Sequence, residues 1–421
     1  MRVNRSLHGL WRHGVRIPLK RLRERARAAR VARSDGGVPV AVDRETELAA
    51  VPFEGGFPPP LSACTVVAAA DYPTRLHPLS VNSTTTEAMH YVDHVAHAPA
   101  MMLEHLTNQF WFPALGLLIS PEGRVWRHSF LGPFRPDFLS SVKQIVERPT
   151  PDGGREPMLY PEQLKRAPRI AEPRLLVANS DKANYGHWLL DIAPLIDLGA
   201  RARLPMLSWT LRPWQRAAIA ALDVPDGLIR EIKPEPVFLE HAIVSNRHTG
   251  ENTQNAHPQT REVFGRMLGN IRKRLGPIET PKRVLVVRGL ANSRNILNRA
   301  ELIEALTPLG FAAIQPDNLS FDEQALTFAQ AEFVICEFGA AMTNVIFCQP
   351  GTKVIEIIAE GQHDRWSSHF NAMLGHEHVV LFQPQTAEAL AAAPRHMKDS
   401  PFAYSVDVAA IVAIVTNMTK N

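Results

Sequence analysis

Cysteine is scarce in this sequence of 421 residues, and long apolar runs are missing. Cys64, Cys336 and Cys348 lie far apart and form no CxxC pair, so neither a disulfide framework nor a thiolate zinc site is indicated. No stretch approaches the ~20 apolar residues that a membrane-spanning helix needs, and the N-terminus lacks the apolar run of ~7–15 residues typical of a signal peptide. We therefore expect a cytoplasmic globular protein of two or three domains.

Several short motifs that mark well-known enzyme sites are also missing. The sequence has no GxGxxG fingerprint, no HExxH zinc motif and no two aspartates two positions apart, the DxD pattern that holds a diphosphate through a metal. His90, His94 and His97 recur at helical spacing, with His105 beyond, but no carboxylate pattern accompanies them. We therefore predict no metal site.

Positive charge is concentrated at the N-terminus. Residues 1–33 hold eleven Lys and Arg against the single acid Glu24, so the rest of the chain carries about −6 of the total net charge of +4. Such a segment is able to lie on anionic lipid, with ~1 kcal/mol from each basic residue, or to be a plain solvated tail. Interleaved aromatic residues are missing from the basic run and the remainder is acidic, so we expect no nucleic-acid partner.

The chain after the tail is typical of a mixed α/β protein. Residues 34–62 are rich in Gly and Pro and predict an irregular linker, and alternation around a Pro-Glu-Gly turn predicts a β-hairpin at about 112–130. From residue 174, short apolar runs alternate with helix-length stretches, the pattern of a parallel sheet covered by helices. A helix over 258–275 ends at a Gly- and Pro-containing segment that predicts an interdomain hinge. A second alternating series begins at residue 283.

These patterns divide the chain into three parts. We predict a basic tail over residues 1–35, an N-terminal domain over 36–278 in which the hairpin segment precedes a Rossmann-like half, and a Rossmann-like C-terminal domain over 279–421.

The helix that begins near Asn184 carries a polar stripe on an otherwise apolar surface. Asn184, His187 and Asp191 recur at spacings of three and four, so they share one face. A His and an Asp one turn apart can act as a base and the carboxylate that orients it. The alternative is that Asn184 only caps the helix and the other two form a satisfied internal pair. Pro194 should kink or end the first part of this helix.

Cationic and small residues follow the strands of the second series. Arg288 closes one apolar run, and Arg294 and Asn298 precede a helix that carries Glu301. Guanidinium groups beside a helix N-terminus suit a diphosphate, although ordinary surface arginines produce the same pattern.

A small-residue turn follows a later strand of the same series. Gly339, Ala340 and Ala341 would let a backbone approach a nucleotide closely, or they form a tight packing turn. Glu356, at the end of the next strand, is placed to bind two ribose hydroxyls or to be a solvated strand end.

Taken together, NYGHWLLDIAPLI, SRNILNRAEL and FGAAMTNVIFCQPGTKVIEI, in this order, resemble the family 61 glycosyltransferases over roughly residues 170–360. The resemblance implies a GT-B architecture, in which two Rossmann-like domains face a cleft, and inversion at the anomeric carbon. It implies a nucleotide sugar, expected to be a UDP-sugar, bound mainly by the C-terminal domain without a further cofactor. The acceptor expected on the N-terminal domain is a glycan or lipid-linked glycan of capsule, exopolysaccharide or lipopolysaccharide assembly.

The resemblance also assigns roles position by position. The catalytic candidates are His187 and Asp191, and the resemblance does not decide which of them is the base. Asn184 and Glu301 are expected to bind the acceptor or to support the site. The residues expected to bind the donor are Arg288, Arg294, Asn298, Gly339, Asn344 and Glu356.

Two positions depart from the family pattern. The usual His-Gly-Ala/Ser-Gly-Leu reads Phe-Gly-Ala-Ala-Met over residues 338–342, and the usual Arg-Arg pair reads Arg294-Asn295. Donor contacts are therefore expected to differ, which leaves a non-catalytic scaffold that binds nucleotide or glycan as an alternative. A dinucleotide-dependent oxidoreductase is a further alternative, against which the missing GxGxxG counts.

Overall fold

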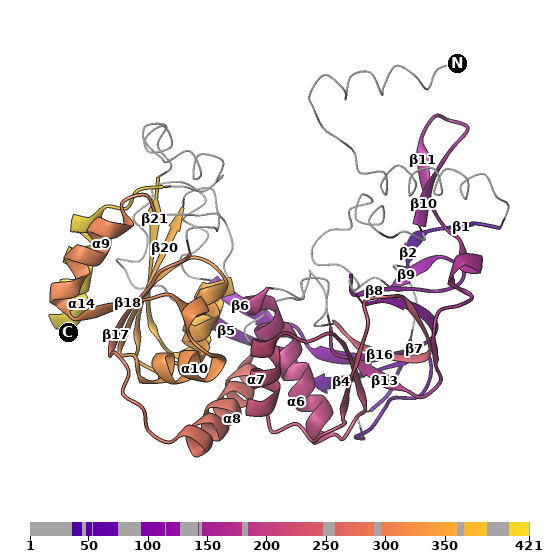
Figure 1. The fold of residues 1–421 in the computed structure, drawn as a ribbon, viewed down its shortest axis with the longest axis horizontal. Coiled ribbons are helices and arrows are strands. Elements are labelled where there is room, and N and C mark those ends of the chain that lie inside the picture. Colours follow the sequence, from indigo (N-terminus) through magenta and orange to yellow (C-terminus); the bar gives the residue numbers. More distant parts are fainter. Residues whose placement is uncertain are drawn as a thin grey trace.

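The computed structural model places the described strands and helices in two lobes (Figure 1). We name the described residues 36–275 the N-terminal lobe and the described residues 282–420 the C-terminal lobe. The basic tail, His90 and Arg294 lie outside the described residues. The structure describes residues 36–43, 48–52, 54–74, 94–113, 115–126, 142, 145–178, 184–246, 257–289, 296–359, 366–384 and 404–420.

An 11-stranded sheet forms the N-terminal lobe. Four of its strands run parallel, in the spatial order β15 (Ile229–Ile232), β14 (Met206–Trp209), β13 (Arg174–Leu176) and β16 (Val237–Ser245). In chain order this is 3-2-1-4, which matches the first four strands of the doubly wound order 3-2-1-4-5-6. The alternating pattern after residue 174 therefore gives the parallel strands that it predicts.

Antiparallel strands extend this sheet beyond β16. The long strand β7 (Met101–Phe112) pairs with β16, and next to it come β8 (Leu117–Ile119) and β9 (Arg124–Trp126). The last two strands form the predicted hairpin, with Ile119 opposite Val125. The same sheet also contains β2 (Ala41–Asp43), β3 (Ala49–Ala50), β4 (Ser62–Val67) and β12 (Arg169–Ile170). A separate three-stranded sheet consists of β1 (Val38–Pro39), β10 (Ile145–Pro149) and β11 (Arg155–Leu159).

One prediction for the first 100 residues is wrong, and one spacing in the sequence does not correspond to a helix. The Gly- and Pro-rich stretch 34–62 contains β1, β2 and β3, because short edge strands need few residues and pair with partners far along the chain. The helical spacing of His94 and His97 misleads, because both residues lie on strand β6 (His94–Ala98), which pairs with β5 (Ala70–Thr74). His97 is exposed, and its Nδ1 lies 2.5 Å from Oδ1 of Asp71.

The segment that connects β13 to β14 changes its helical geometry twice. Asn184 caps α5 (Tyr185–His187) by accepting hydrogen bonds from the backbone N–H groups of Gly186 and His187. A π-helical turn, η3 (Trp188–Ile192), follows, and α6 (Ala193–Arg201) has Pro194 in its first turn. Pro194 has no N–H to donate to the preceding turn, so the widened π turn at this point fits its predicted role as a helix breaker.

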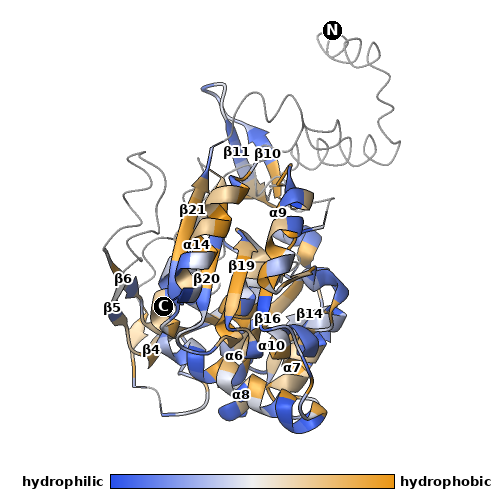
Figure 2. Cartoon of the chain, turned by 90° about the vertical axis from the view of Figure 1, so that its left-hand side faces the viewer, coloured by the Kyte–Doolittle hydropathy of each residue, from blue (hydrophilic) through white to orange (hydrophobic). Residues whose placement is uncertain are grey.

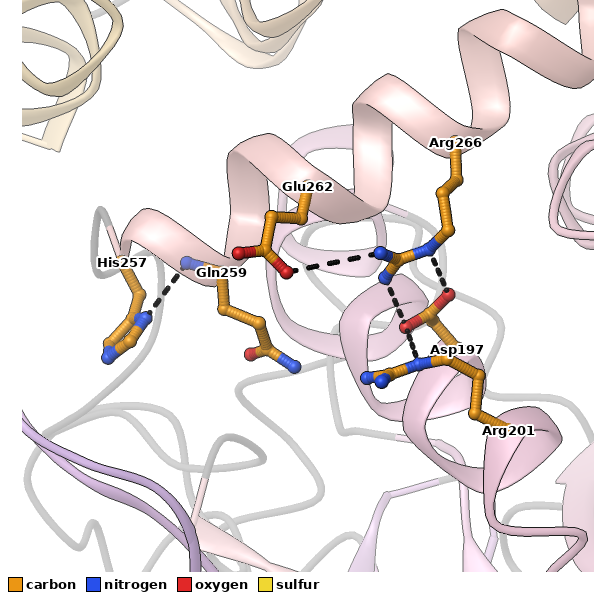
Figure 3. A network of polar contacts seen from close by, with 6 residues as sticks. All are labelled: Asp197, Arg201, His257, Gln259, Glu262 and Arg266. Carbon is orange, nitrogen blue, oxygen red and sulfur yellow. Dashed lines mark hydrogen bonds and ion pairs between the residues drawn. The ribbon is translucent and has the colours of Figure 1, made fainter.

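The remaining helices of the lobe are α7 (Pro213–Ala221) and α8 (Pro258–Leu275). Asp197 of α6 is buried and binds Arg266 of α8 through both carboxylate oxygens, at 2.6 and 3.1 Å (Figure 3). Arg201 donates to the same carboxylate at 2.8 Å. This network fixes α6 against α8. In the described part of the chain, no helix is both long and apolar enough to span a bilayer.

A five-stranded parallel sheet forms the C-terminal lobe. Its spatial order is β18 (Phe311–Ile314), β17 (Arg283–Val286), β19 (Phe333–Glu337), β20 (Lys353–Ala359) and β21 (Glu377–Gln383). In chain order this is 2-1-3-4-5, which is the flavodoxin-like doubly wound order. Figure 2 shows β19 and β21 in hydrophobic colours, as expected for strands covered on both faces.

Helices cover both faces of this sheet. One core contains α9 (Arg299–Leu306) and α14 (Val408–Lys420), and the opposite face carries α10 (Phe321–Gln330), the 3-10 helix η7 (Ala340–Phe347) and α11 (Trp366–Leu374). The described residues also include the short 3-10 turns η2 (Pro161–Leu164), η5 (Thr307–Leu309) and η6 (Pro316–Asn318). The prediction of a mixed α/β fold is confirmed.

The two lobes share one hydrophobic core. Buried side chains of α6 and α8 join those of α10 and η7 in a single cluster. The ring of Phe347 lies edge-on to Phe264 of α8 at 5.3 Å between centroids, and to Phe321 of α10 at 6.0 Å. Figure 1 shows α7 and α8 between the two sheets. Helix α10 of the C-terminal lobe contacts both of them. The segment 276–282, predicted as a hinge, connects α8 to β17 without helix or strand.

Candidate functional site

The connections of the C-terminal sheet reverse direction between β17 and β19, and open α/β sheets bind ligands outside the carboxyl ends of the strands at such a point. Arg288 lies two residues after the end of β17, and Gly339 lies two residues after the end of β19. The Nη1 group of Arg288 donates to the carbonyl of Phe338 at 3.2 Å. Two predicted donor residues therefore flank the switch point on loops that are tied together.

A buried ion pair supports this edge of the sheet. Arg299, the first residue of α9, donates through Nε and Nη2 to the two carboxylate oxygens of Glu337 at 3.0 and 3.2 Å. It also donates to the carbonyl of Arg288 at 3.0 Å. Burial raises the pKa of Glu337, and the guanidinium groups of Arg299 and Arg288 oppose that rise. Sequence reasoning missed this pair, although an acid directly after the apolar run FVIC was a visible signal.

The small-residue turn after β19 starts a helix instead of a nucleotide-binding loop of the GxGxxG kind. Gly339 has a φ of 149°, a conformation that favours glycine, and η7 begins at the next residue. Asn344 of η7 is fully buried. Its Oδ1 accepts from the Tyr185 hydroxyl at 2.7 Å, and its Nδ2 donates to Gln324 at 2.9 Å. Asn344 thus links α5 of one lobe to η7 and α10 of the other.

Gly186 brings the predicted polar helix directly against that turn. A Cβ at Gly186 would lie 2.8 Å from Oγ1 of Thr343 and 3.6 Å from Cα of Ala340. Real Cβ atoms do not come as close as the first of these distances, so only glycine fits without a shift. The helix that carries His187 therefore approaches the carboxyl edge of the C-terminal sheet at backbone distance.

His187 and Asp191 form the predicted pair. Nδ1 of His187 lies 3.5 Å from Oδ2 of Asp191, and the side chains are 19% and 0% exposed. The two residues lie on either side of the junction between α5 and the π-helical turn. π-helical turns occur frequently at functional sites, because they change which side chains share a face. This geometry suits a base whose ring is held by a carboxylate.

Other predicted residues have structural partners. Asn184 caps α5, as the alternative interpretation proposed. Asn298 donates to the carbonyl of Val406 and accepts from its N–H, both at 2.9 Å, so its amide holds the segment before α14. Glu301 accepts from Asn298 at 3.1 Å in the first turn of α9. These contacts hold Asn298 against the C-terminal segment and Glu301 against Asn298.

Glu356 lies elsewhere in the fold than predicted. Strand β20 continues to Ala359, so Glu356 lies within the strand and not at its end. Its carboxylate is fully buried, where it accepts from the Ser367 hydroxyl at 2.8 and 2.9 Å and lies 3.1 Å from Nε2 of His378. The sequence concealed this position because Ile357 and Ile358 fit a strand end and a strand interior equally well.

The described residues contain no group of three or more His, Cys, Asp or Glu side chains placed to hold a metal ion. A hollow of about 630 Å³ opens at the amino edge of the C-terminal sheet, beside Arg283, Lys353 and Thr419. This edge is opposite to the one where open α/β sheets bind their ligands, so we do not assign this hollow to the site.

Comparison with known proteins gives one family. Residues 185–355 match the family model described as Glycosyltransferase 61. The matched range begins at α5 and ends within β20, so it includes His187, Asp191, Arg288 and the turn at Gly339. The resemblance seen in the sequence is confirmed.

Other comparisons add no functional information. No curated protein matches the chain. A solved structure of dienelactone hydrolase from Anabaena variabilis aligns with 13% sequence identity over 34% of this chain and 88% of that chain, at a TM-score of 0.20. A TM-score this low supports no inference about fold or activity.

Proposed function

We propose, from the match of residues 185–355 to the family 61 glycosyltransferases, that this protein is an inverting glycosyltransferase with a GT-B arrangement. It transfers a sugar from a nucleotide sugar, for which a UDP-sugar is the first candidate, to a glycan or glycolipid acceptor in surface polysaccharide assembly. The observation that carries the proposal is the close approach of Gly186 to Thr343, which sets the His187–Asp191 pair beside the switch point of the C-terminal sheet.

Burial favours one of the two candidate bases. Asp191 is 0% exposed and is unable to touch an acceptor, whereas His187 is 19% exposed. In our proposal His187 removes the proton from the acceptor hydroxyl as that oxygen attacks the anomeric carbon. Asp191 orients the imidazole through Nδ1 and stabilises the imidazolium that forms. Hydrogen bonds of this kind are often long in unliganded enzymes and shorten in the substrate complex.

The leaving nucleotide diphosphate is assigned to the Arg288 side of the switch point. Among the described residues, the guanidinium groups of Arg288 and Arg299 lie here, and Arg299 is bound to the carboxylate of Glu337. Because Arg299 is bound to Glu337 through two hydrogen bonds, Arg288 is the group available to the diphosphate. A fixed positive charge at this position stabilises the negative charge that develops on the leaving oxygen, without need of a metal cofactor.

The substitution Asp191→Asn tests the catalytic assignment. We expect transfer to fall by a factor on the order of 10²–10⁴, the usual contribution of general base catalysis, while UDP binding and thermal stability stay close to wild type. Loss of the carboxylate charge also removes a stabiliser of the imidazolium. The measurement is sugar transfer, or UDP release, across a panel of UDP-sugars.

Asp197→Asn is the matched control. Asp197 is a buried carboxylate on the same helical segment, but it binds Arg201 and Arg266 (Figure 3). This variant should lose stability and keep its turnover per folded molecule. Full activity of Asp191→Asn would refute the assignment, and nucleotide binding without transfer by the wild type would favour the non-catalytic scaffold.

The proposed location is the cytoplasmic face of the membrane, with peripheral contact through the basic residues 1–33. This segment contains eleven basic residues and a single acid. Each basic residue contributes ~1 kcal/mol of binding free energy near an anionic surface. The full chain should co-sediment with phosphatidylserine-containing vesicles at low salt and not with neutral vesicles. Equal behaviour with both would exclude this contact.

A further inference from the structure

We propose that the N-terminal lobe carries a second binding site, a pocket for a neutral sugar unit of a glycan, on the free edge of strand β7. The pocket has a volume of about 350 Å³. That is at the small end of the ~300–1,000 Å³ range of small-molecule sites. The identity of the occupant as a glycan rests on the proposed function, whereas the pocket itself rests only on the structure.

The pairing of β7 creates the pocket. One edge of β7 pairs with β16 along most of its length. On the other edge, β4 pairs up to Glu104 and β8 pairs from Phe110 onward. The carbonyl of His105 accepts from the N–H of Leu61 at 2.9 Å, just before β4 begins. Residues 106–109 therefore lie between the two neighbouring strands and pair with neither. Both ends of this gap are closed, so a peptide strand is unable to add to the sheet here, and a compact ligand fits better.

Polar side chains of strands β7 and β9 line the gap, together with Ser120 and Glu122 from the turn between β8 and β9. Glu104 and Trp126 are both buried, and the indole N–H of Trp126 donates to the Glu104 carboxylate at 2.7 Å. Gln109 donates to the carbonyl of Thr107 at 3.0 Å, which fixes its amide at the wall. The lining thus combines acceptors, donors and an aromatic ring, and this mixture suits hydroxyl groups on one face of a sugar and C–H groups on the other.

The charge of the lining distinguishes this pocket from the donor site. Among the described residues, the lining contains two acids, Glu104 and Glu122, and one cation, Arg124. The excess of negative charge disfavours phosphate and therefore nucleotide ligands, whereas Arg288 at the switch point favours them. A neutral glycan is the class that hydrogen-bonds to carboxylates and amides without an opposing charge.

Backbone strain is concentrated at the same pocket. Among the described residues, four that are not glycine have a positive φ, and two of them, Leu61 and Asn108, line this pocket with φ of 55°. Leu61 is also 55% exposed, although it is a large apolar residue. Strained residues persist where the surrounding structure holds them and are often found at ligand sites.

The test measures the binding of neutral oligosaccharides to the full chain. The probes are di- to tetrasaccharides of glucose, galactose, mannose and xylose, used in saturation-transfer NMR and calorimetry. We expect at least one series to bind, and the variant Asn108→Gly with Gln109→Ala to weaken that binding ten-fold or more. Both changes remove amides, and the first also relieves the positive φ, so the fold should be retained.

Asp223→Gly is the control, because Asp223 has a similar φ of 54° and lies outside the pocket. It should bind the oligosaccharide like the wild type. Equal binding by the pocket variant, or no binding of any probe by a wild type that turns over a nucleotide sugar, would overturn this proposal and leave the proposed function intact. Pocket-dependent binding by a protein that binds no nucleotide sugar would support the pocket and overturn the proposed function.

Discussion

Gly186 shows how one residue sets the distance between the two halves of the candidate site. The substitution Gly186→Ala places a methyl group 2.8 Å from Oγ1 of the buried Thr343, so the Thr343 side chain, α5 or η7 must shift. We expect a loss of ~1–3 kcal/mol in the free energy of unfolding, as for overpacked cores, together with reduced transfer. Urea unfolding and turnover measured on the same preparation check this prediction.

Gly265→Ala is the matched control for that substitution. Gly265 lies on the exposed side of α8, and a methyl group at its Cα would have no other atom within 4 Å. Alanine there should stabilise the helix by ~0.5–1 kcal/mol. If both variants behave alike, the close approach at Gly186 does not control the site.

His376 gives the protein a defined response to acid. Burial lowers the pKa of His376 to about 3, and the neighbouring His378 contributes to this lowering. The unfolded chain, with a histidine pKa of ~6.5, binds the proton that the folded protein excludes, so stability falls as pH drops from about 6.5 towards 3. One such group contributes a slope of up to ~1.4 kcal/mol per pH unit. Urea unfolding between about pH 4 and pH 6 measures it.

The variant His376→Asn should lose part of that slope, because it has no group to protonate. His97→Gln is the control, since the ring of His97 is 64% exposed. An unchanged slope in His376→Asn would show that other groups cause the acid sensitivity.

Individual residues were predictable from the sequence where local spacing determines their position. His187 and Asp191 come together because residues four apart on a helix lie on the same side, whereas Asn184 caps the helix. Asn298 and Glu356 were not predictable in this way, because their partners Val406 and His378 lie on distant segments. Local sequence patterns do not predict contacts between such distant segments.

At the scale of elements, the ion pair between Arg299 and Glu337 joins the start of α9 to the end of β19. Arg299→Met should leave a buried carboxylate without its main partner, at a cost of ~3–5 kcal/mol in unfolding free energy. The double variant with Glu337→Met should recover much of that loss, because it removes the uncompensated charge. Urea unfolding of both variants is the measurement. A double variant no more stable than the single one would show that packing, not charge, dominates.

The order of elements after residue 174 followed from the alternation of apolar runs and helix-length stretches. The strands that escaped prediction, above all β7 and β4, belong to the antiparallel part of the N-terminal lobe. Strand β7, with the sequence MMLEHLTNQFWF, contains mixed polar and apolar residues because different parts of it face a pocket, a core and neighbouring strands. Alternation of polar and apolar residues does not predict a strand when its successive residues lie in different surroundings.

At the scale of the whole molecule, the shared core predicts that both lobes unfold together. Phe347→Ala removes a ring that packs against Phe264 of one lobe and Phe321 of the other. We expect a single calorimetric transition in the wild type and in the variant, with a loss of ~3–5 kcal/mol. Phe311→Ala, on the far face of the C-terminal sheet, should lower the same transition. Two separate transitions, only one of which shifts, would contradict a shared core.

The shared core could not be predicted from the sequence, although both α/β series could. Each series shows which residues are apolar, but α8 buries one surface against its own lobe and another against α10 and η7. Both surfaces produce the same amphipathic pattern. The arrangement of the lobes therefore depends on contacts between segments far apart in the chain.

Binding of nucleotide sugars to the purified protein tests the proposed transferase and its donor site together. Calorimetry with UDP-, GDP-, CMP- and dTDP-sugars, and with NAD(P), is performed on the wild type and on Arg288→Ala, each with and without Mn²⁺. We expect one nucleotide sugar to bind the wild type without metal and to bind Arg288→Ala at least ten-fold more weakly. Binding of NAD(P) alone, or nucleotide-sugar binding that does not depend on Arg288, would contradict the assignment.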